Sequence, residues 1–132
     1  MQTISYEDAA DFRAELRRFL RRSEDCARTH GLTPAQHLLL LQIAGSKGSR
    51  STVSELVERL ALTQSTVTEL VQRAVAAGLI TRRTSTSDGR VVHLTLTPEG
   101  EEKLDKVHTE LGPERAQLRR IVDRLEHGAD GG

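Results

Sequence analysis

The sequence predicts a mainly α-helical protein with one small β-hairpin, and three observations support this fold class. Apolar residues recur at helical spacing along most of the chain. Three segments begin with Ser or Thr followed three residues later by Asp, Gln or Glu, a pattern that starts helices. Between residues 79 and 96 the pattern changes to the alternation typical of strands. We expect about six helices around this hairpin.

The overall composition is that of a globular protein. The 132 residues are enough for one domain with a hydrophobic core and too few for two. No apolar run approaches the roughly 20 residues that cross a bilayer, and the N-terminus lacks a basic segment followed by an apolar one. Cys26 is the single cysteine, so an internal disulfide is excluded. We therefore expect one domain over residues 1–132, located in the cytoplasm and without a membrane partner.

The net charge is zero, but the charge is unevenly distributed. Residues 50–90 hold six arginines and four acids, a net charge of +2, whereas residues 97–132 hold six bases and nine acids, a net charge of −3. Arginine outnumbers lysine 16 to 3, and arginine is the better bidentate ligand for phosphate and guanine. A GC-rich genome produces the same bias. The distribution permits DNA binding without proving it.

The first helix is expected over residues 6–28. Ser5 can cap it, with Asp8 at the third helical position, and Gly31 can adopt the left-handed conformation that ends it. One stripe of this helix is apolar and comprises Phe12, Leu16, Phe19, Leu20 and Ala27. The other face is interpreted as solvated and partly paired with acids, and it carries Arg13, Arg17, Arg18, Arg21 and Arg22.

A second helix is expected from Pro34. Thr33 and Gln36 form a capping box, and proline is favoured in the first helical turn. Residues 38–43 are almost continuously apolar, so we expect this helix to be nearly fully buried, and Gly45 ends it.

Two short amphipathic helices follow, joined by a tight turn. Thr52 and Glu55 start the first, over Val53–Leu60, and residues 61–63 form the turn. The second begins at about Gln64 and is ended by Gly78. Two helices joined so closely are more typical of a helix-turn-helix than of an ordinary helical hairpin.

The β-hairpin is expected from residues 79–81 and 91–96, which are rich in β-branched side chains. The residues from 84 to 89 are all turn formers, so the hairpin has a polar, extended tip. Thr97 then opens a helix, which Gly112 and Pro113 interrupt. A last helix carries an apolar stripe of Leu118, Ile121, Val122 and Leu125.

The segments GLTPAQHLLLL and TVSELVERLALTQSTVTELVQRAVAAGLITRRTSTSDGRVVHLTLTPEG together resemble the MarR family of bacterial regulators. The resemblance covers roughly residues 31–100 and, more loosely, the first helix. It implies a winged helix-turn-helix lobe over residues 33–96 and dimerisation through helices at residues 5–28 and 98–126. It also implies a homodimeric repressor that binds a near-palindromic operator in double-stranded DNA.

The chain departs from the family pattern after LTPEG. Members of the family usually continue with a long helix and then a last helix. Here Gly112 and Pro113 interrupt the first of these early, so the expected dimerisation region looks shortened.

The second helix of the helix-turn-helix has the composition of a DNA-recognition helix. Its spacing directs inward an apolar set of Val67, Leu70, Val71, Ala74 and Val75. On the outer face, Gln can pair with adenine, a Thr methyl can pack on thymine, and the helix N-terminus favours a phosphate. Periodicity leaves Thr66 at the edge of that face, and the family pattern adds it. A merely solvated helix is the alternative; the candidate DNA contacts are Thr63, Gln64, Ser65, Thr66, Thr68, Gln72 and Arg73.

The hairpin supplies a second set of candidate DNA contacts. Asp88 and Arg90 match the family's Asp-x-Arg wing, and a guanidinium at a hairpin tip can enter a narrow minor groove. Asp88 would orient that arginine or a neighbouring one. Arg82 and Arg83 are expected at the base of the hairpin, where they suit phosphates.

The resemblance also implies release from DNA by a small molecule or by oxidation. A small aromatic or phenolic effector would bind between the dimerisation helices and the DNA-binding lobe, and the nearest candidates for holding an aromatic carboxylate are Arg17, Arg21 and His37. Cys26 offers a redox interpretation, although the family's peroxide sensors carry their cysteine nearer the start of the first helix. Cys26 could also join His37 and His108 at a zinc site. Their spacing matches no ligand motif, so no metal or cofactor is expected.

Two other classes of function remain as alternatives. An enzyme is not expected, because the chain has no phosphate loop, no Gly-x-Ser-x-Gly or HExxH motif and no Cys/His set at ligand spacing. A winged helix could instead bind another protein without contacting DNA. That function would need apolar residues on the outer face of residues 64–77, where the pattern places none, and this favours DNA.

Overall fold

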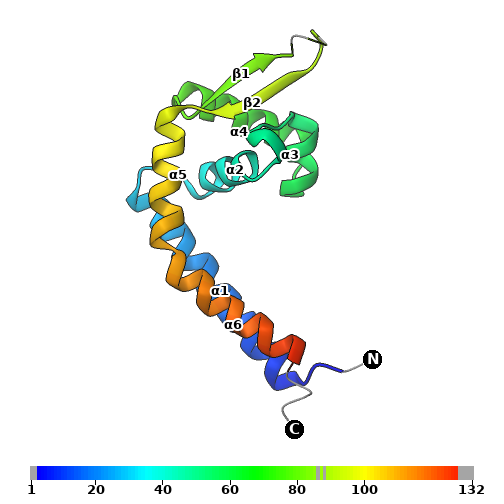
Figure 1. Cartoon of the computed structure of the whole chain (residues 1–132), viewed down its shortest axis with the longest axis vertical. Coiled ribbons are helices and arrows are strands. Elements are labelled where there is room, and N and C mark those ends of the chain that lie inside the picture. Colours follow the sequence, from blue (N-terminus) through cyan, green and yellow to red (C-terminus); the bar gives the residue numbers. More distant parts are fainter. Residues whose placement is uncertain (1–2, 86, 88, 128–132) are drawn as a thin grey trace.

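The computed structural model describes residues 3–85, 87 and 89–127. In chain order the elements are α1 (Tyr6–Thr29), α2 (Pro34–Ala44), the short 3-10 helix η1 (Lys47–Ser49), α3 (Val53–Leu60), α4 (Gln64–Ala76), β1 (Ile80–Thr84), β2 (Val92–Leu96), α5 (Pro98–Glu110) and α6 (Gly112–His127). Figure 1 shows α1 and α6 side by side in a long arm, with α2, α3, α4 and the hairpin gathered in a lobe at its far end. This confirms the predicted mainly α-helical fold with one hairpin.

The predicted helix starts are confirmed by their hydrogen bonds. The Ser5 hydroxyl accepts from the Asp8 amide at 3.1 Å. Thr33 with Gln36, and Thr52 with Glu55, form complete capping boxes, in which each side chain bonds the other residue's backbone N–H. Because these bonds satisfy amides that lack a partner within the helix, local sequence alone determines where α1, α2 and α3 begin.

The core of the lobe is built from aliphatic side chains of several elements. Leu39, Leu40 and Ile43 of α2 are fully buried and belong to the same cluster as Leu56 of α3 and Val67 of α4. Each such side chain contributes about 1.5–3 kcal/mol when fully buried. This packing holds α3 and α4 against α2.

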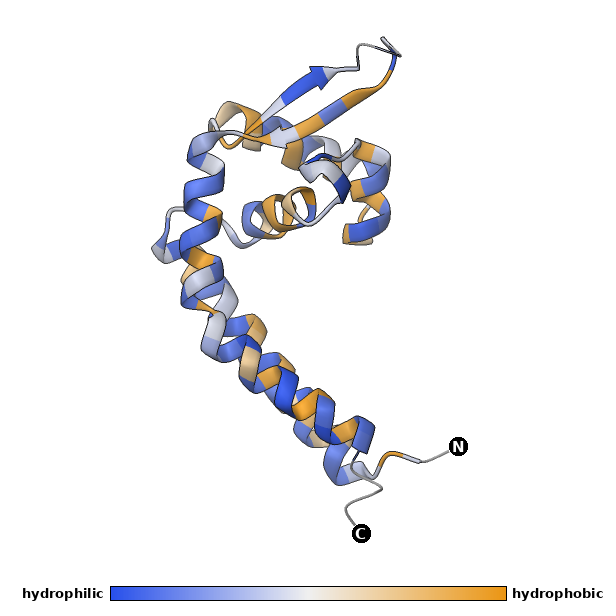
Figure 2. Cartoon of the chain, viewed as in Figure 1, coloured by the Kyte–Doolittle hydropathy of each residue, from blue (hydrophilic) through white to orange (hydrophobic). Residues whose placement is uncertain are grey.

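The expectation that α2 is nearly fully buried was wrong. Leu38 is 48% exposed and Leu41 is 37% exposed, on a face that turns away from the core. Helical geometry gives the reason, because a continuous apolar run covers every face of a helix and the lobe packs against only part of α2. Figure 2 shows α2 as a largely apolar helix next to the more hydrophilic arm.

The hairpin is anchored to the lobe through a third, very short segment. β1 pairs antiparallel with β2, from Ile80 opposite Leu96 to Thr84 opposite Val92. On the other edge of β2, the buried Ser51 exchanges two backbone hydrogen bonds with Leu94, of 3.1 and 2.7 Å. The hairpin therefore extends from a fixed base beside α3.

The arm is held together by ion pairs and by partly buried apolar residues. Arg124 of α6 contacts Asp11 of α1 at 3.0 Å. Phe12, Leu16 and Phe19 are half-buried, and on the facing stripe of α6 only Ile121 is buried. The break in the helix predicted at Gly112 and Pro113 is limited to Leu111, because both residues are accommodated in the first turn of α6.

None of the described helices has the length and apolar composition needed to span a membrane.

The first turn of α5 packs unusually closely against Leu79, in the short segment between α4 and β1. A Cβ atom added to Gly100 would lie 2.2 Å from the carbonyl oxygen of Leu79. We expect Gly100→Ala to lower the free energy of unfolding by about 1–3 kcal/mol, because the backbone must shift to relieve this overlap. Urea unfolding followed by circular dichroism measures the change. Gly89→Ala is the control, since a Cβ there meets nothing within 4 Å, and equal midpoints for the two variants would contradict the expectation.

Candidate nucleic-acid interface

The α4 helix presents one face to the core and the other to solvent. Val67, Val71 and Ala74 are buried, while Leu70 and Val75 are half-buried, so the predicted inward set is confirmed. The outer face carries no large apolar side chain along Gln64–Ala76. A face whose exposed side chains are polar, apart from Ala76, is suited to hydrogen bonding with a polar partner.

Most of the predicted contact residues lie on this outer face. Thr68 is the exception and is half-buried. Thr66, which periodicity left at the edge, is exposed. The exposed candidates on or next to α4 are Thr63, Gln64, Ser65, Thr66, Gln72 and Arg73.

Hydroxyl groups are concentrated at the N-terminus of α4. The Thr63 hydroxyl accepts from the Thr66 amide at 3.2 Å and donates to the Thr66 hydroxyl at 2.8 Å. The Ser65 hydroxyl lies 3.3 Å from that of Thr63. These bonds orient three hydroxyls around a helix end whose partial positive charge attracts anions.

The basic residue at the far end of this face is already paired. Arg73 forms an ion pair with Glu69 one turn earlier, at 2.6 Å. Both side chains are mostly exposed, so this pair contributes little to stability and can be exchanged for a phosphate.

The hairpin carries its arginines along β1 and at the turn. Arg82 and Arg83 lie within β1 rather than at its base, because the strand extends to Thr84. Both are exposed, neither forms an ion pair with any described residue, and neighbouring strand residues point to opposite faces. Arg90 is exposed in the turn before β2. Asp88 lies outside the described residues.

The three effector candidates do not share one site in this chain. Arg17 and Arg21 line a hollow of about 780 Å³ along α1, together with Leu16, Leu20 and Glu24. His37 is not among the lining residues and is only 5% exposed. Burial lowers the pKa of His37, and the nearby His108 and Arg115 lower it further.

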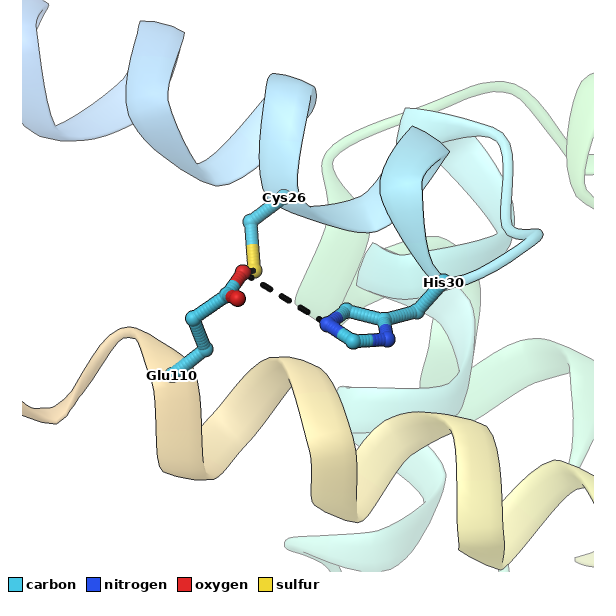
Figure 3. A group of neighbouring side chains, drawn as sticks. All are labelled: Cys26, His30 and Glu110. Carbon is cyan, nitrogen blue, oxygen red and sulfur yellow. Dashed lines mark hydrogen bonds and ion pairs between the residues drawn. The ribbon is translucent and has the colours of Figure 1, made fainter.

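Cys26 has different neighbours from those expected. Its thiol donates to Glu110 at 2.6 Å, and Glu110 also lies 3.5 Å from His30 (Figure 3). Sequence reasoning missed both partners, although Cys26 and His30 are four residues apart, as neighbours on one helix face are. Burial, followed by the hydrogen bond and the negative charge of Glu110, raises the pKa of the Cys26 thiol to about 11. A protonated thiol is a poor nucleophile, so this environment is unfavourable for oxidation.

The comparisons with known proteins find transcriptional regulators as relatives. Residues 30–91 match the family model described as MarR family. The chain is 39% identical over 77 residues to the HTH-type transcriptional repressor MdtR of Bacillus subtilis, and 30% identical over 76 residues to the repressor YetL of the same organism. Each match covers 58% of this chain and 48% or 46% of the relative, so the chain spans about half the length of these relatives.

A solved structure extends the similarity to nearly the whole chain. The crystal structure of AbsC, a MarR family transcriptional regulator from Streptomyces coelicolor, superimposes with a TM-score of 0.67 and 25% identity. The superposition covers 95% of this chain and 85% of AbsC. The arrangement of helices and hairpin is thus that of a winged helix-turn-helix protein.

The buried His37 makes stability depend on pH. Its lowered pKa means that the folded protein binds a proton less readily than the unfolded chain does. As the pH falls below about 6.5, the unfolded chain takes up this proton first, so the free energy of unfolding decreases. We expect the urea concentration at the unfolding midpoint to decrease when the pH is lowered from about 7.5 to 5.5. The decrease should be smaller in His37→Gln. His127→Gln, at an exposed position, is the control, and an unchanged pH dependence in His37→Gln would contradict this assignment.

Proposed function

Because the chain belongs to the MarR family, we propose that it is a sequence-specific, double-stranded DNA-binding transcriptional regulator that acts as a repressor in the cytoplasm. The observation that carries this proposal is the polar outer face of α4, exposed beside a hairpin that bears three exposed arginines. The names of the two Bacillus subtilis relatives support repression as the outcome. In this proposal residues 33–96 form the DNA-binding lobe.

The N-terminal half of α4 would read the major groove. The Gln64 amide can donate to and accept from an adenine edge, and the Thr66 and Thr68 methyls can contact thymine. The hydroxyls of Thr63 and Ser65 and the backbone amides at the start of α4 would bond phosphates. Because Val67 and Val71 are buried in the lobe core, the helix is held rigidly while its other face binds.

The hairpin would act as the wing. Arg82 and Arg83 project from opposite faces of β1 and are proposed to bind phosphates on either side of a groove. Arg90, at the turn, is proposed to enter the minor groove, where the potential is most negative. Asp88 stays the proposed partner that orients an arginine of the wing.

A second copy of the chain is proposed to cover the arm, through the helices at residues 5–28 and 98–126. The half-buried Phe12, Leu16 and Phe19 of α1 and Leu118 and Leu125 of α6 provide the apolar surface for this contact. The two α4 helices would then lie roughly 34–36 Å apart, one turn of B-DNA, and face a near-palindromic operator.

The hollow along α1 is the proposed effector site. Arg17 and Arg21 can hold a carboxylate or phenolate, and Leu20 can pack against an aromatic ring. Leu20 is 49% exposed, so its apolar surface is available to such a ligand. His37 is left out of this proposal because it is buried and does not line the hollow.

The dimer is tested by mass in solution. The chain has a mass of 14.6 kDa, and we expect light scattering at micromolar concentration to report twice this value. The apolar stripes of α1 and α6 are left partly exposed in one copy, and their burial drives the association. A monomeric mass at this concentration would refute the dimer.

Two substitutions distinguish the recognition of bases by α4 from the electrostatic attraction of the hairpin to DNA. The operator is first enriched from a pool of random double-stranded DNA, and binding is measured at several salt concentrations. We expect Gln64→Ala to cost about 1–3 kcal/mol of binding free energy and to relax preference at one base pair. Arg90→Ala should weaken binding to all related sequences. In the parent protein, the logarithm of the binding constant should fall with the logarithm of the salt concentration with a slope of about −5, for about six phosphates neutralised per dimer, and Arg90→Ala should make this slope shallower.

The controls are matched substitutions on the arm. Arg119→Ala removes the same charge from an exposed position of α6, and Gln117→Ala removes the same amide. Both should bind like the parent protein. If Arg90→Ala also binds like the parent, the hairpin is not a DNA wing, and if no sequence is enriched, DNA is not the partner.

A further inference from the structure

We propose that Cys26, His30 and Glu110 form a binding site for a divalent transition-metal ion of the zinc class (Figure 3). Within the described part of the chain, this is the one group of three such side chains whose ligand atoms all lie within 4.8 Å of one another. A sulfur, an imidazole nitrogen and a carboxylate oxygen form a mixed donor set that suits Zn²⁺ or Co²⁺ better than Mg²⁺ or Ca²⁺.

The three ligands come from two packed helix ends. Cys26 lies in the last turn of α1, and His30 is the residue that caps this helix. Glu110 is the last residue of α5, which packs against α1 at this point. The backbone positions of all three are therefore set by helices rather than by a mobile loop, which favours a preorganised site.

The spacing of the donor atoms is close to that of a tetrahedral site. Metal–ligand bonds of about 2.0–2.3 Å place tetrahedral ligands roughly 3.3–3.8 Å apart. The 3.5 Å between Glu110 Oε2 and His30 Nε2 already meets this requirement. The 2.6 Å between Glu110 Oε2 and Cys26 Sγ must open by about 1 Å, and the partly exposed Glu110 side chain can rotate to allow it. Three protein ligands leave the fourth position to water.

The imidazole of His30 provides an independent indication. Its Nε2 atom is buried and makes no hydrogen bond with a described residue. Its contact with the Glu110 carboxylate, at 3.5 Å, is long for a hydrogen bond, and coordination to a metal ion would satisfy this buried nitrogen more fully. Figure 3 shows this atom directed toward the carboxylate of Glu110.

The neighbouring charges allow a cation to enter. Arg22 lies 3.9 Å from Glu110, but it also contacts Glu114 at 3.3 Å and can stay with that carboxylate. On binding, the Cys26 thiol gives up its proton to solvent, and the thiolate, imidazole and carboxylate each donate one electron pair to the ion. A bound ion would link α1 to α5 where the arm meets the lobe.

The site is tested in the free protein, so the result does not depend on DNA binding. Reduced, metal-free full-length protein is titrated with Co²⁺, which reports thiolate ligation by a charge-transfer band and tetrahedral geometry by intense visible bands. We expect one ion per chain, displaced by Zn²⁺. Cys26→Ser should abolish the charge-transfer band, and His30→Gln and Glu110→Gln should each weaken binding by about tenfold or more.

A matched control variant and the melting temperature test the same metal site. Asp25→Asn removes the same charge as Glu110→Gln from the residue next to Cys26 and should leave binding unchanged. Zn²⁺ should raise the melting temperature of the parent protein and of Asp25→Asn, but not of Glu110→Gln, whose exposed position keeps the fold intact. Absence of the cobalt bands in the parent, their persistence in Cys26→Ser, or equal weakening in Asp25→Asn would overturn the proposal.

Discussion

The orientation of α4, the helix proposed to face DNA, depends on the contact between the first turn of α5 and the chain just after α4. The Thr97 amide donates to the Leu79 carbonyl at 3.0 Å, and the Thr97 hydroxyl donates to the Gly78 carbonyl at 2.6 Å. Gly100 allows the helix backbone to approach Leu79 within a distance that no larger residue permits. This contact joins the segment between α4 and β1 to the start of α5, so it fixes α5 against the lobe.

The helix α4 packs into the core with one face and exposes a polar surface on the other. Its aliphatic face is buried against α2 and α3, and this burial supplies the stability that holds the helix in place. The outer face contributes little to folding, since its side chains are exposed and the hydroxyls at its N-terminal end bond one another. A protein built in this way can change its outer face at little cost in stability.

The arm formed by α1 and α6 has less buried apolar surface than the lobe. Its apolar stripes are only half-covered in a single copy, and ion pairs such as Arg124 with Asp11 lie at its surface. Exposed pairs of this kind add little stability, so α1 and α6 depend on further burial for a rigid arrangement. The group of Cys26, His30 and Glu110 lies at the other end of α1, where polar contacts between α1 and α5 add to the apolar packing of one buried cluster that includes Ala27 and Val107.

The sequence by itself determined what depends on neighbours along the chain. The caps at Ser5, Thr33 and Thr52 and the inward face of α4 could be predicted because they rest on spacings of three or four residues. Only the tertiary structure decided which apolar residues of α2 stay exposed and that Cys26 meets Glu110, 84 positions away. Periodicity reports which residues share a face of one helix, whereas the partner of that face is set by how the helices pack, and this information is distributed over the whole chain.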